Sequence, residues 1–219
     1  MIFTVIFNFI LLSVLVGYSF AFNRFINPNK TEIYNLDILY GLFILIFISL
    51  FLNFFFPLKF FFYLVSTIGF LFFVEAWIKK KIKIKLYIHF LILFLLIFIT
   101  YRQGDNVDTP MYHLQIIKWF QNEKIVIGLS NLEIRFGSNS LWFGLFSLLK
   151  FKLNNFNSIY TLNLIPFSIL FYQVFSKENK LSYLFITLTI SFILLFSFLH
   201  PFLNGVILNH LHNTEVDTV

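Results

Sequence analysis

Long apolar runs alternate with short polar segments along most of this chain. An apolar run of about 18 residues is long enough to cross the roughly 30 Å hydrocarbon core of a bilayer as a helix. Six segments are predicted to cross in this way: Ile2–Phe22, Leu36–Phe56, Leu58–Ile78, Leu86–Thr100, Phe156–Phe175 and Leu181–Leu199. The pattern therefore predicts an all-α, polytopic transmembrane fold.

Residues 101–140 break the apolar pattern with a concentration of acidic, basic and aromatic side chains. Loops of this length are uncommon in compact domains and tend to be functional. Within this loop, Asp108-Thr109-Pro110 is a helix-start signal, because threonine caps a helix well and proline suits its first position. We therefore expect a helix over Pro110–Gln121.

The predicted helix has an apolar face formed by Ile116, Ile117 and Phe120, so it should lie in the membrane interface. A second apolar segment, Leu141–Leu149, is too short to span and is predicted to be an interfacial or re-entrant helix. We interpret Asn53 and Asn163 as ordinary helix-packing residues of membrane segments.

Basic residues set the predicted orientation. The densest run, from Lys79 to Lys85, should face the cytoplasm, which places residues 101–140 outside it. Glu75 lies four residues before Lys79, a spacing that favours an ion pair, and His89 is expected to reach the same interface. Because the basic residues adjoin apolar segments, the net charge of +6 indicates membrane lipids as partners and no nucleic acid.

Composition agrees with a multi-pass membrane protein. Hydrophobic residues make up 59% of the chain and charged residues 12%, and the mean hydropathy is +0.85, values that exclude an ordinary soluble domain. The absence of cysteine removes disulfides and thiolate metal sites. Because a polar tail follows the sixth segment, we expect residues 1–219 to form one membrane domain, the N-terminal portion of a longer protein.

The loop residues permit a reaction without requiring one. Asp108 would complement the dipole of the helix that it precedes, His113 would be a surface histidine, and Arg135 would contact a lipid phosphate. No nucleophile-elbow, zinc-protease or phosphate-loop motif is present in the sequence.

A resemblance adds to this interpretation. It is carried by Asp108-x-x-x-Tyr112-His113-Leu114-Gln115-x-x-x-Trp119, then Gly128-Leu129-x-Asn131-Leu132-x-x-Arg135, then Asn139-Ser140-x-Trp142-Phe143. This string resembles a group of bacterial membrane proteins related to the GT-C glycosyltransferases, which include protein mannosyltransferases and lipid A aminoarabinose transferases. The motif is fairly specific as a whole, although each piece alone is weak.

The resemblance implies a multi-pass protein of the bacterial inner membrane that transfers a sugar from a polyprenyl-phosphate donor to an extracytoplasmic hydroxyl. Asp108 would act as the general base or help to hold a divalent cation, with Asp105 in reserve. Asp217 matches a second acid that such enzymes often carry in a later loop, and is another candidate metal ligand. The substrate-binding residues would be Tyr112, His113, Trp119 and Arg135. Tyr112 and Trp119 would stack on the sugar or anchor the helix at the interface, and Arg135 would balance the leaving phosphate.

Two alternatives stay open. The chain could be a non-catalytic polysaccharide-assembly protein, a partner of a flippase or polymerase, with the loop as its docking surface. It could also be an inactive truncated fragment. A transporter is disfavoured, because the predicted spans carry almost no charge in their interiors.

Overall fold

A computed structural model describes residues 2–26, 28, 32–100, 112–131, 134–137, 141–150, 152–153, 156–157 and 162–176. Within these residues the chain is helical, apart from a two-residue antiparallel pair of β1 (Lys152–Leu153) with β2 (Phe156–Asn157). The predicted all-α class is therefore confirmed. The sixth predicted segment, Leu181–Leu199, lies outside the described residues.

The described α-helices are α1 (Ile2–Ile26), α2 (Ile38–Phe55), α3 (Phe62–Ile78), α4 (Leu86–Thr100), α5 (Leu114–Asn122), α6 (Leu141–Leu148) and α7 (Leu164–Ser176). Short 3-10 turns add η1 (Asn35–Asp37), η2 (Leu58–Phe60), η4 (Leu129–Asn131) and η5 (Ile134–Gly137). The first four predicted segments match these helices to within about one turn.

The predicted start of the fifth segment is wrong. We expected a helix from Phe156, but α7 begins at Leu164, and Phe156 belongs to β2. Two asparagines separate β1 from β2 in the sequence, and asparagine favours the tight turns of hairpins. Local turn chemistry therefore overrides the apolar character of this stretch.

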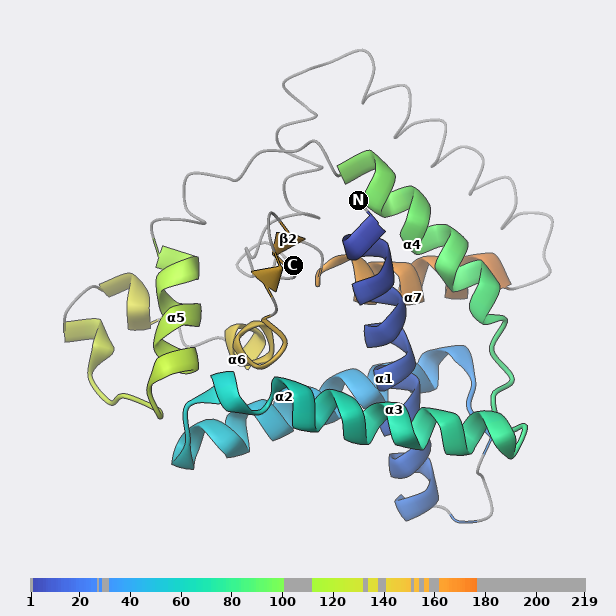
Figure 1. The fold of residues 1–219 in the computed structure, drawn as a ribbon, viewed down its shortest axis with the longest axis horizontal. Coiled ribbons are helices and arrows are strands. Elements are labelled where there is room, and N and C mark those ends of the chain that lie inside the picture. The colour runs from blue at the N-terminus through green and yellow to red at the C-terminus, as the bar shows by residue number, and fades with distance from the viewer. Residues whose placement is uncertain are drawn as a thin grey trace.

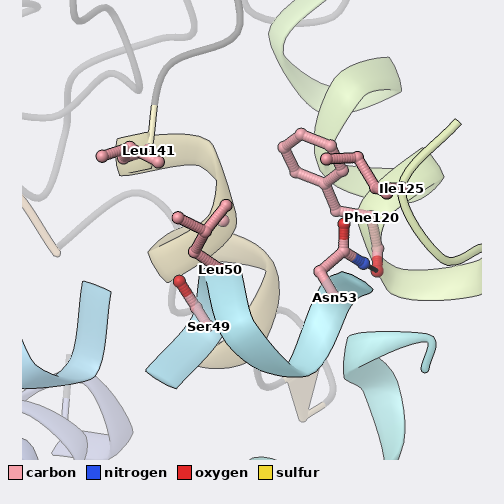
Figure 2. A pocket seen from close by; sticks show the side chains of 7 residues that line it. Ser49, Leu50, Asn53, Phe120, Ile125 and Leu141 are labelled. Carbon is pink, nitrogen blue, oxygen red and sulfur yellow. Dashed lines mark hydrogen bonds between the residues drawn. The ribbon is translucent and has the colours of Figure 1, made fainter. Parts of the chain in front are cut away.

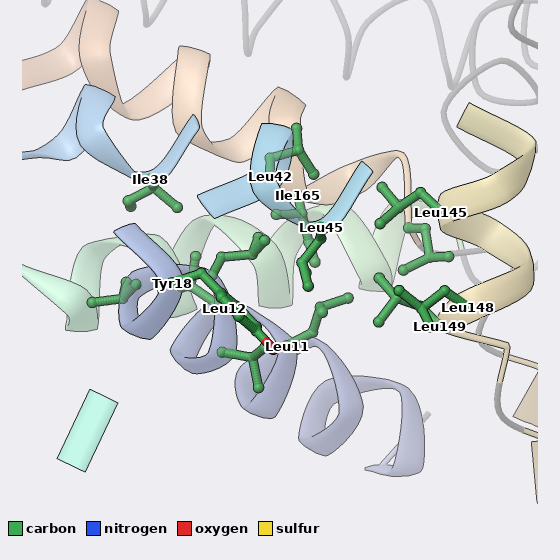
Figure 3. Packing of buried hydrophobic residues seen from close by; sticks show 14 of the residues in the cluster. Leu11, Leu12, Tyr18, Ile38, Leu42, Leu45, Leu145, Leu148, Leu149 and Ile165 are labelled. Carbon is green, nitrogen blue, oxygen red and sulfur yellow. The ribbon is translucent and has the colours of Figure 1, made fainter. Parts of the chain in front are cut away.

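Helix α1 lies at the centre of the arrangement (Figure 1). It contacts α2, α3 and α4, while α7 packs on α4, and α5 packs on α6. Helices α2 and α3 cross α1 in the lower half of Figure 1, and the η2 turn that joins them lies towards α5 and α6. A buried apolar cluster continues from α1 through α2 to α6 and α7, as the side chains in Figure 3 show.

Glycines allow α1 to approach its neighbours at backbone distance. A Cβ atom on Gly17 would overlap the Gly69 carbonyl oxygen of α3, and one on Gly41 of α2 would overlap the Leu15 carbonyl oxygen. A Cβ on Gly69 would lie 2.6 Å from the side chains of Val14 and Tyr18. Small residues at helix crossings are the usual means of close packing between membrane helices.

Two hydroxyl groups reinforce these crossings. The Tyr18 hydroxyl donates to the Val65 carbonyl oxygen of α3 at 2.8 Å. The Ser19 hydroxyl accepts the N–H of Gly41 at 3.0 Å and donates to the Leu15 carbonyl oxygen at 2.9 Å. The bond from Tyr18 joins α1 to α3 and the bond from Gly41 joins α2 to α1, whereas the bond from Ser19 to Leu15 lies within α1.

Large apolar side chains point outward from α2 and α4. They recur every three or four residues and include Tyr40, Phe43, Phe47, Phe51 and Phe54 on α2, and Tyr87, Leu91, Phe94 and Phe98 on α4. Among the described helices, Ile2–Ile26 and Asn35–Phe55 are long and apolar enough to cross a membrane, with mean hydropathies of 2.2 and 2.5. Three further apolar helices, Phe62–Ile78, Leu86–Phe98 and Leu164–Gln173, are shorter.

The end of α3 combines ion pairing with a strained turn. Glu75 accepts hydrogen bonds from Lys79 at 2.6 Å, as predicted, and from Arg24 of α1 at 2.9 Å. Lys80 has a φ of 51°, and its N–H bonds to the Trp77 carbonyl while that of Lys81 bonds to the Ala76 carbonyl. This is a Schellman motif in which lysine occupies the left-handed position that glycine favours, at a cost of roughly 1 kcal/mol.

His89 was expected to reach the membrane interface, but it does not. Its imidazole is buried and stacks on Tyr172 of α7, with ring centroids 4.4 Å apart and planes inclined by 25°. Nearby, the Asn35 side chain of η1 donates to the Ile169 carbonyl oxygen at 3.1 Å and to Gln173 at 2.9 Å. The packing of α7 against α4 and η1 therefore turns the ring inward.

We predict that Gly17→Ala destabilises the fold by about 2 kcal/mol, because overpacking costs roughly 1–3 kcal/mol and the opposing carbonyl is backbone. Alanine is the better helix former, so propensity acts against this loss. Thermal unfolding in detergent should show a midpoint lower by roughly 4–8 °C.

Gly144→Ala is the matched control for this change. The nearest atom to its new Cβ would be the Ser49 hydroxyl oxygen at 3.1 Å, which is a side-chain group that can shift. The control should melt within about 2 °C of the parent chain. Equal midpoints for Gly17→Ala and Gly144→Ala would contradict the close crossing of α1 and α3.

Candidate functional site

Helix α5 presents an apolar face to α6. Ile116, Ile117 and Phe120 are buried, whereas Lys118 and Asn122 are exposed. The predicted amphipathic helix is therefore confirmed over Leu114–Gln121, although its expected start at Pro110 lies outside the described residues. Such a face keeps α5 flat against α6.

Asn53, at the end of α2, holds the C-terminal end of α5. Its side-chain amide donates to the carbonyl oxygens of Phe120 at 3.2 Å and Glu123 at 3.1 Å. Its own backbone carbonyl accepts the N–H of Ile125 at 2.9 Å. Helix-terminal carbonyls lack partners within their own helix, so Asn53 acts as a cap supplied from another element.

Helix α6 is fixed between α5, α2 and the start of α7. The Ser147 hydroxyl lies 2.7 Å from the Phe143 carbonyl oxygen and 3.1 Å from that of Ile117 on α5. The Trp142 indole N–H donates to the Asn163 side chain at 2.9 Å. The predicted short helix is confirmed as Leu141–Leu148.

Tyr112 and His113 stand directly before α5. The His113 imidazole is fully buried, with its centroid 4.1 Å from the Tyr112 ring and 5.2 Å from the Phe143 ring of α6. Tyr112 and Trp119 are half-buried. The structure thus brings Tyr112 and His113 together against α6, and the expected surface histidine is an enclosed one.

A small pocket opens between the end of α2, α5 and α6 (Figure 2). Its lining is Ser49, Leu50, Asn53, Phe120, Ile125, Leu141 and Gly144. The cavity volume is about 70 Å³, well below the roughly 300–1,000 Å³ of ligand pockets. The Ser49 hydroxyl donates to the Ile46 carbonyl at 2.7 Å, so the pocket suits an apolar group better than a polar ligand.

The remaining predicted site residues are not brought together by the described structure. Asp105, Asp108 and Asp217 lie outside the described residues, as does the side chain of Arg135, whose backbone belongs to η5. No cluster of three or more metal-ligating side chains occurs among the described residues. The roles assigned to Asp108, Arg135 and Asp217 therefore stay predictions.

The roles of two residues in the site were not predicted from the sequence. Asn53 and Asn163 were interpreted as packing residues, yet one caps α5 and the other accepts the Trp142 indole. Their partners lie 67 and 21 residues away, so no local pattern marks them. The available signal was an asparagine inside or beside an apolar helix, where an amide must find partners.

The family described as a domain of unknown function (DUF8201) matches residues 1–204. No curated protein and no solved structure matches the chain.

We predict that Asn53→Ala loosens α5 without unfolding the chain. The change removes the donor to two carbonyls, a loss worth about 1–3 kcal/mol. Hydrogen exchange of the α5 amides, followed by mass spectrometry, should accelerate by roughly tenfold.

Asn122→Ala is the control, since Asn122 is exposed. Its side-chain amide donates to the Lys118 carbonyl within α5 at 3.0 Å, and its only other bond among the described residues is a long, exposed one of 3.4 Å from Lys59. In this control, the hydrogen-exchange rate of the α5 amides should change by less than about twofold. Unchanged protection of α5 in Asn53→Ala would show that the cap is not what holds this helix.

Proposed function

We propose that this chain, which belongs to the DUF8201 family, is a multi-pass membrane protein that transfers a sugar from a polyprenyl phosphate to an extracytoplasmic hydroxyl. The observation that supports this most directly is the platform of α5 and α6. This platform follows α4 as a pair of short helices, in the loop where GT-C-like proteins carry juxtamembrane helices and an essential acid.

Membrane embedding is supported by the distribution of side chains. The outward stripes of aromatic and aliphatic residues on α2 and α4 would be costly in water, because monomeric soluble proteins rarely expose large contiguous apolar patches. The helix crossings instead use Gly17, Gly41 and Gly69. Small residues inside and large apolar residues outside are the arrangement that lipid favours.

The orientation follows from the lysines. Helix α3 extends over 17 residues from η2 to Lys79, which corresponds to about 25 Å. Helices α5 and α6 both contact η2, so they lie towards the end of α3 that is away from the lysines. With Lys79–Lys85 cytoplasmic, the α5–α6 platform faces the outside, where a lipid-linked sugar would be used.

The proposed chemistry centres on Asp108, four residues before Tyr112. The Asp108 carboxylate would accept the proton of the acceptor hydroxyl as that oxygen bonds to the sugar and the polyprenyl phosphate departs. Arg135 would balance the charge of the leaving phosphate, and Tyr112 and Trp119 would contact the sugar. The buried His113 supports this scheme as a positioning residue, since its contact with Phe143 anchors the start of α5.

One observation favours a second candidate, a non-catalytic polysaccharide-assembly protein. Ile127 and Ile134, in the segments after α5, are 96% and 83% exposed. Apolar tips of this kind suit docking to a partner as well as to lipid. The variants below separate the two functions, because a docking protein needs no carboxylate at position 108.

The orientation can be measured with single-cysteine variants, since the chain has no cysteine of its own. Asn122→Cys should react with a membrane-impermeant thiol reagent in intact cells. Lys83→Cys should react only after the cells are opened. Labelling of position 83 but not 122 in intact cells would refute the orientation.

Our catalytic prediction is that Asp108→Asn lowers sugar transfer by at least about a hundredfold, the effect typical of losing a general base. Labelled sugar transfer from a panel of polyprenyl-phosphate sugars, in membranes containing the full chain, is the measurement. Asp105→Asn is the matched control and should retain most activity, because Asp105 lies in a Gly-Asp-Asn stretch typical of a turn.

The amount of each variant found in the membrane distinguishes a loss of catalysis from a loss of folding. Both variants should accumulate like the parent chain, since the amide and the carboxylate are nearly isosteric. Normal transfer by Asp108→Asn would rule out the general-base role. Loss of that variant from the membrane would indicate a structural helix-capping role instead.

A further inference from the structure

The loops α1–α2 and α3–α4 are docked together at the lysine end of the bundle. Ile33 is fully buried and forms a parallel bridge with Ile82. The Ile33 N–H donates to the Lys81 carbonyl at 2.9 Å, and the Lys83 N–H donates to the Ile33 carbonyl at 3.0 Å. The backbone that carries the lysines is therefore held in one conformation.

We define the lysine surface as Lys79, Lys80, Lys81, Lys83 and Lys85. Lys79 pairs with Glu75, and Lys83 lies 3.4 Å from Glu32. Across the described chain, no side-chain hydrogen bond or ion pair engages the other three members, Lys80, Lys81 and Lys85.

Positive charge on this surface exceeds what the protein itself neutralises. Together with Arg24, which also binds Glu75, the five lysines make six cations. Against them stand Glu32, Glu75 and the buried Asp37 of the α1–α2 loop, which leaves a surplus of three charges among the described residues. The end of α3 offers only about half a negative charge from its dipole. The hydrogen bond from the Tyr34 hydroxyl, with Lys83 adding to it, lowers the pKa of the Glu32 carboxyl, so Glu32 already carries its negative charge at neutral pH.

The strained turn at Lys80 is a second, independent observation. A glycine would satisfy the left-handed position without strain, yet lysine stands there with its side chain exposed. Strain at such a position persists where the surroundings impose it, and it gathers at functional sites. A ligand for the Lys80 ammonium group would account for lysine at this position.

Aromatic residues show the depth of the surface. Trp77 precedes the lysines and is 61% exposed, and Tyr87 follows them and is 68% exposed. Tryptophan and tyrosine concentrate at the headgroup level of membranes. In the proposed embedding, lysines flanked in this way would lie at the depth of lipid phosphates.

We propose that the lysine surface is a binding site for the phosphate of an anionic phospholipid headgroup, with Lys80, Lys81 and Lys85 as its principal contacts. The site rests on the membrane embedding proposed above and does not depend on sugar transfer. It would bind lipid on the side opposite the α5–α6 platform, and would anchor the docked loops to one leaflet.

The test uses the full chain in a neutral detergent, titrated with phosphatidylglycerol or phosphatidylcholine and followed by native mass spectrometry. The parent chain should bind phosphatidylglycerol at least about tenfold more tightly. The triple variant Lys80→Asn, Lys81→Gln, Lys85→Gln should lose this preference; asparagine is chosen because it tolerates the left-handed conformation.

The control triple Lys59→Gln, Lys118→Gln, Lys124→Gln removes the same charge from exposed lysines around the α5 end and should keep the preference. Equal loss in both triples, or no preference in the parent chain, would overturn the proposal. Competition by inorganic phosphate or a short DNA duplex as effective as added phosphatidylglycerol would overturn it too, by assigning the surface to soluble anions.

Two further measurements separate loss of lipid binding from poor folding and from loss of membrane embedding. The double variant Lys81→Gln, Lys85→Gln leaves the Schellman turn intact, and it should still lose most of the preference if the triple variant folds poorly. Resistance to alkaline extraction from membranes tests the embedding separately. A chain that is extracted contradicts the proposed function, whereas an embedded chain without lipid preference contradicts only the headgroup site.

Discussion

Backbone contact between α1 and its two neighbours requires side chains no larger than hydrogen at Gly17, Gly41 and Gly69. Because these crossings bring carbonyl oxygens and N–H groups of different helices together, the Tyr18 and Ser19 hydroxyls can bond across them. The crossings also fix the position of the C-terminal end of α2 relative to α1. Asn53 can cap α5 only because α2 is held at this position against α1.

The α5–α6 platform is therefore held directly by the helix bundle. Asn53 holds the C-terminal end of α5, and α6 seats against α2 with Gly144 beside Ser49. The Trp142 indole then ties α6 to Asn163, at the start of α7. A loop that would otherwise be loosely held is attached at three points to helices that belong to the packed core, which is how a surface platform acquires fixed geometry.

Sequence predicted the parts that depend on neighbouring residues. The length of the apolar runs located α1 to α4. Spacing within one helix predicted the face of Ile116, Ile117 and Phe120 and the Glu75–Lys79 pair. Prediction from sequence failed where contacts between residues far apart in the chain determine the structure. The inward turn of His89 and the caps from Asn53 and Asn163 depend on tertiary partners. The hairpin before α7 is a local feature, and its two-asparagine turn signal was overlooked within an apolar stretch. The expected acid site lies outside the described residues, so its geometry remains a prediction.

The bridge between Ile33 and Ile82 has a consequence for the order of assembly. The glycine crossings, this bridge and the stacking of Phe9 on Phe90 are all formed within the first 90 residues of the chain. Proteins are synthesised from the N-terminus at about 5–20 residues per second, and units fold as they are completed. The α1–α4 bundle can thus close before α5 is made, and the later helices then dock on a finished surface.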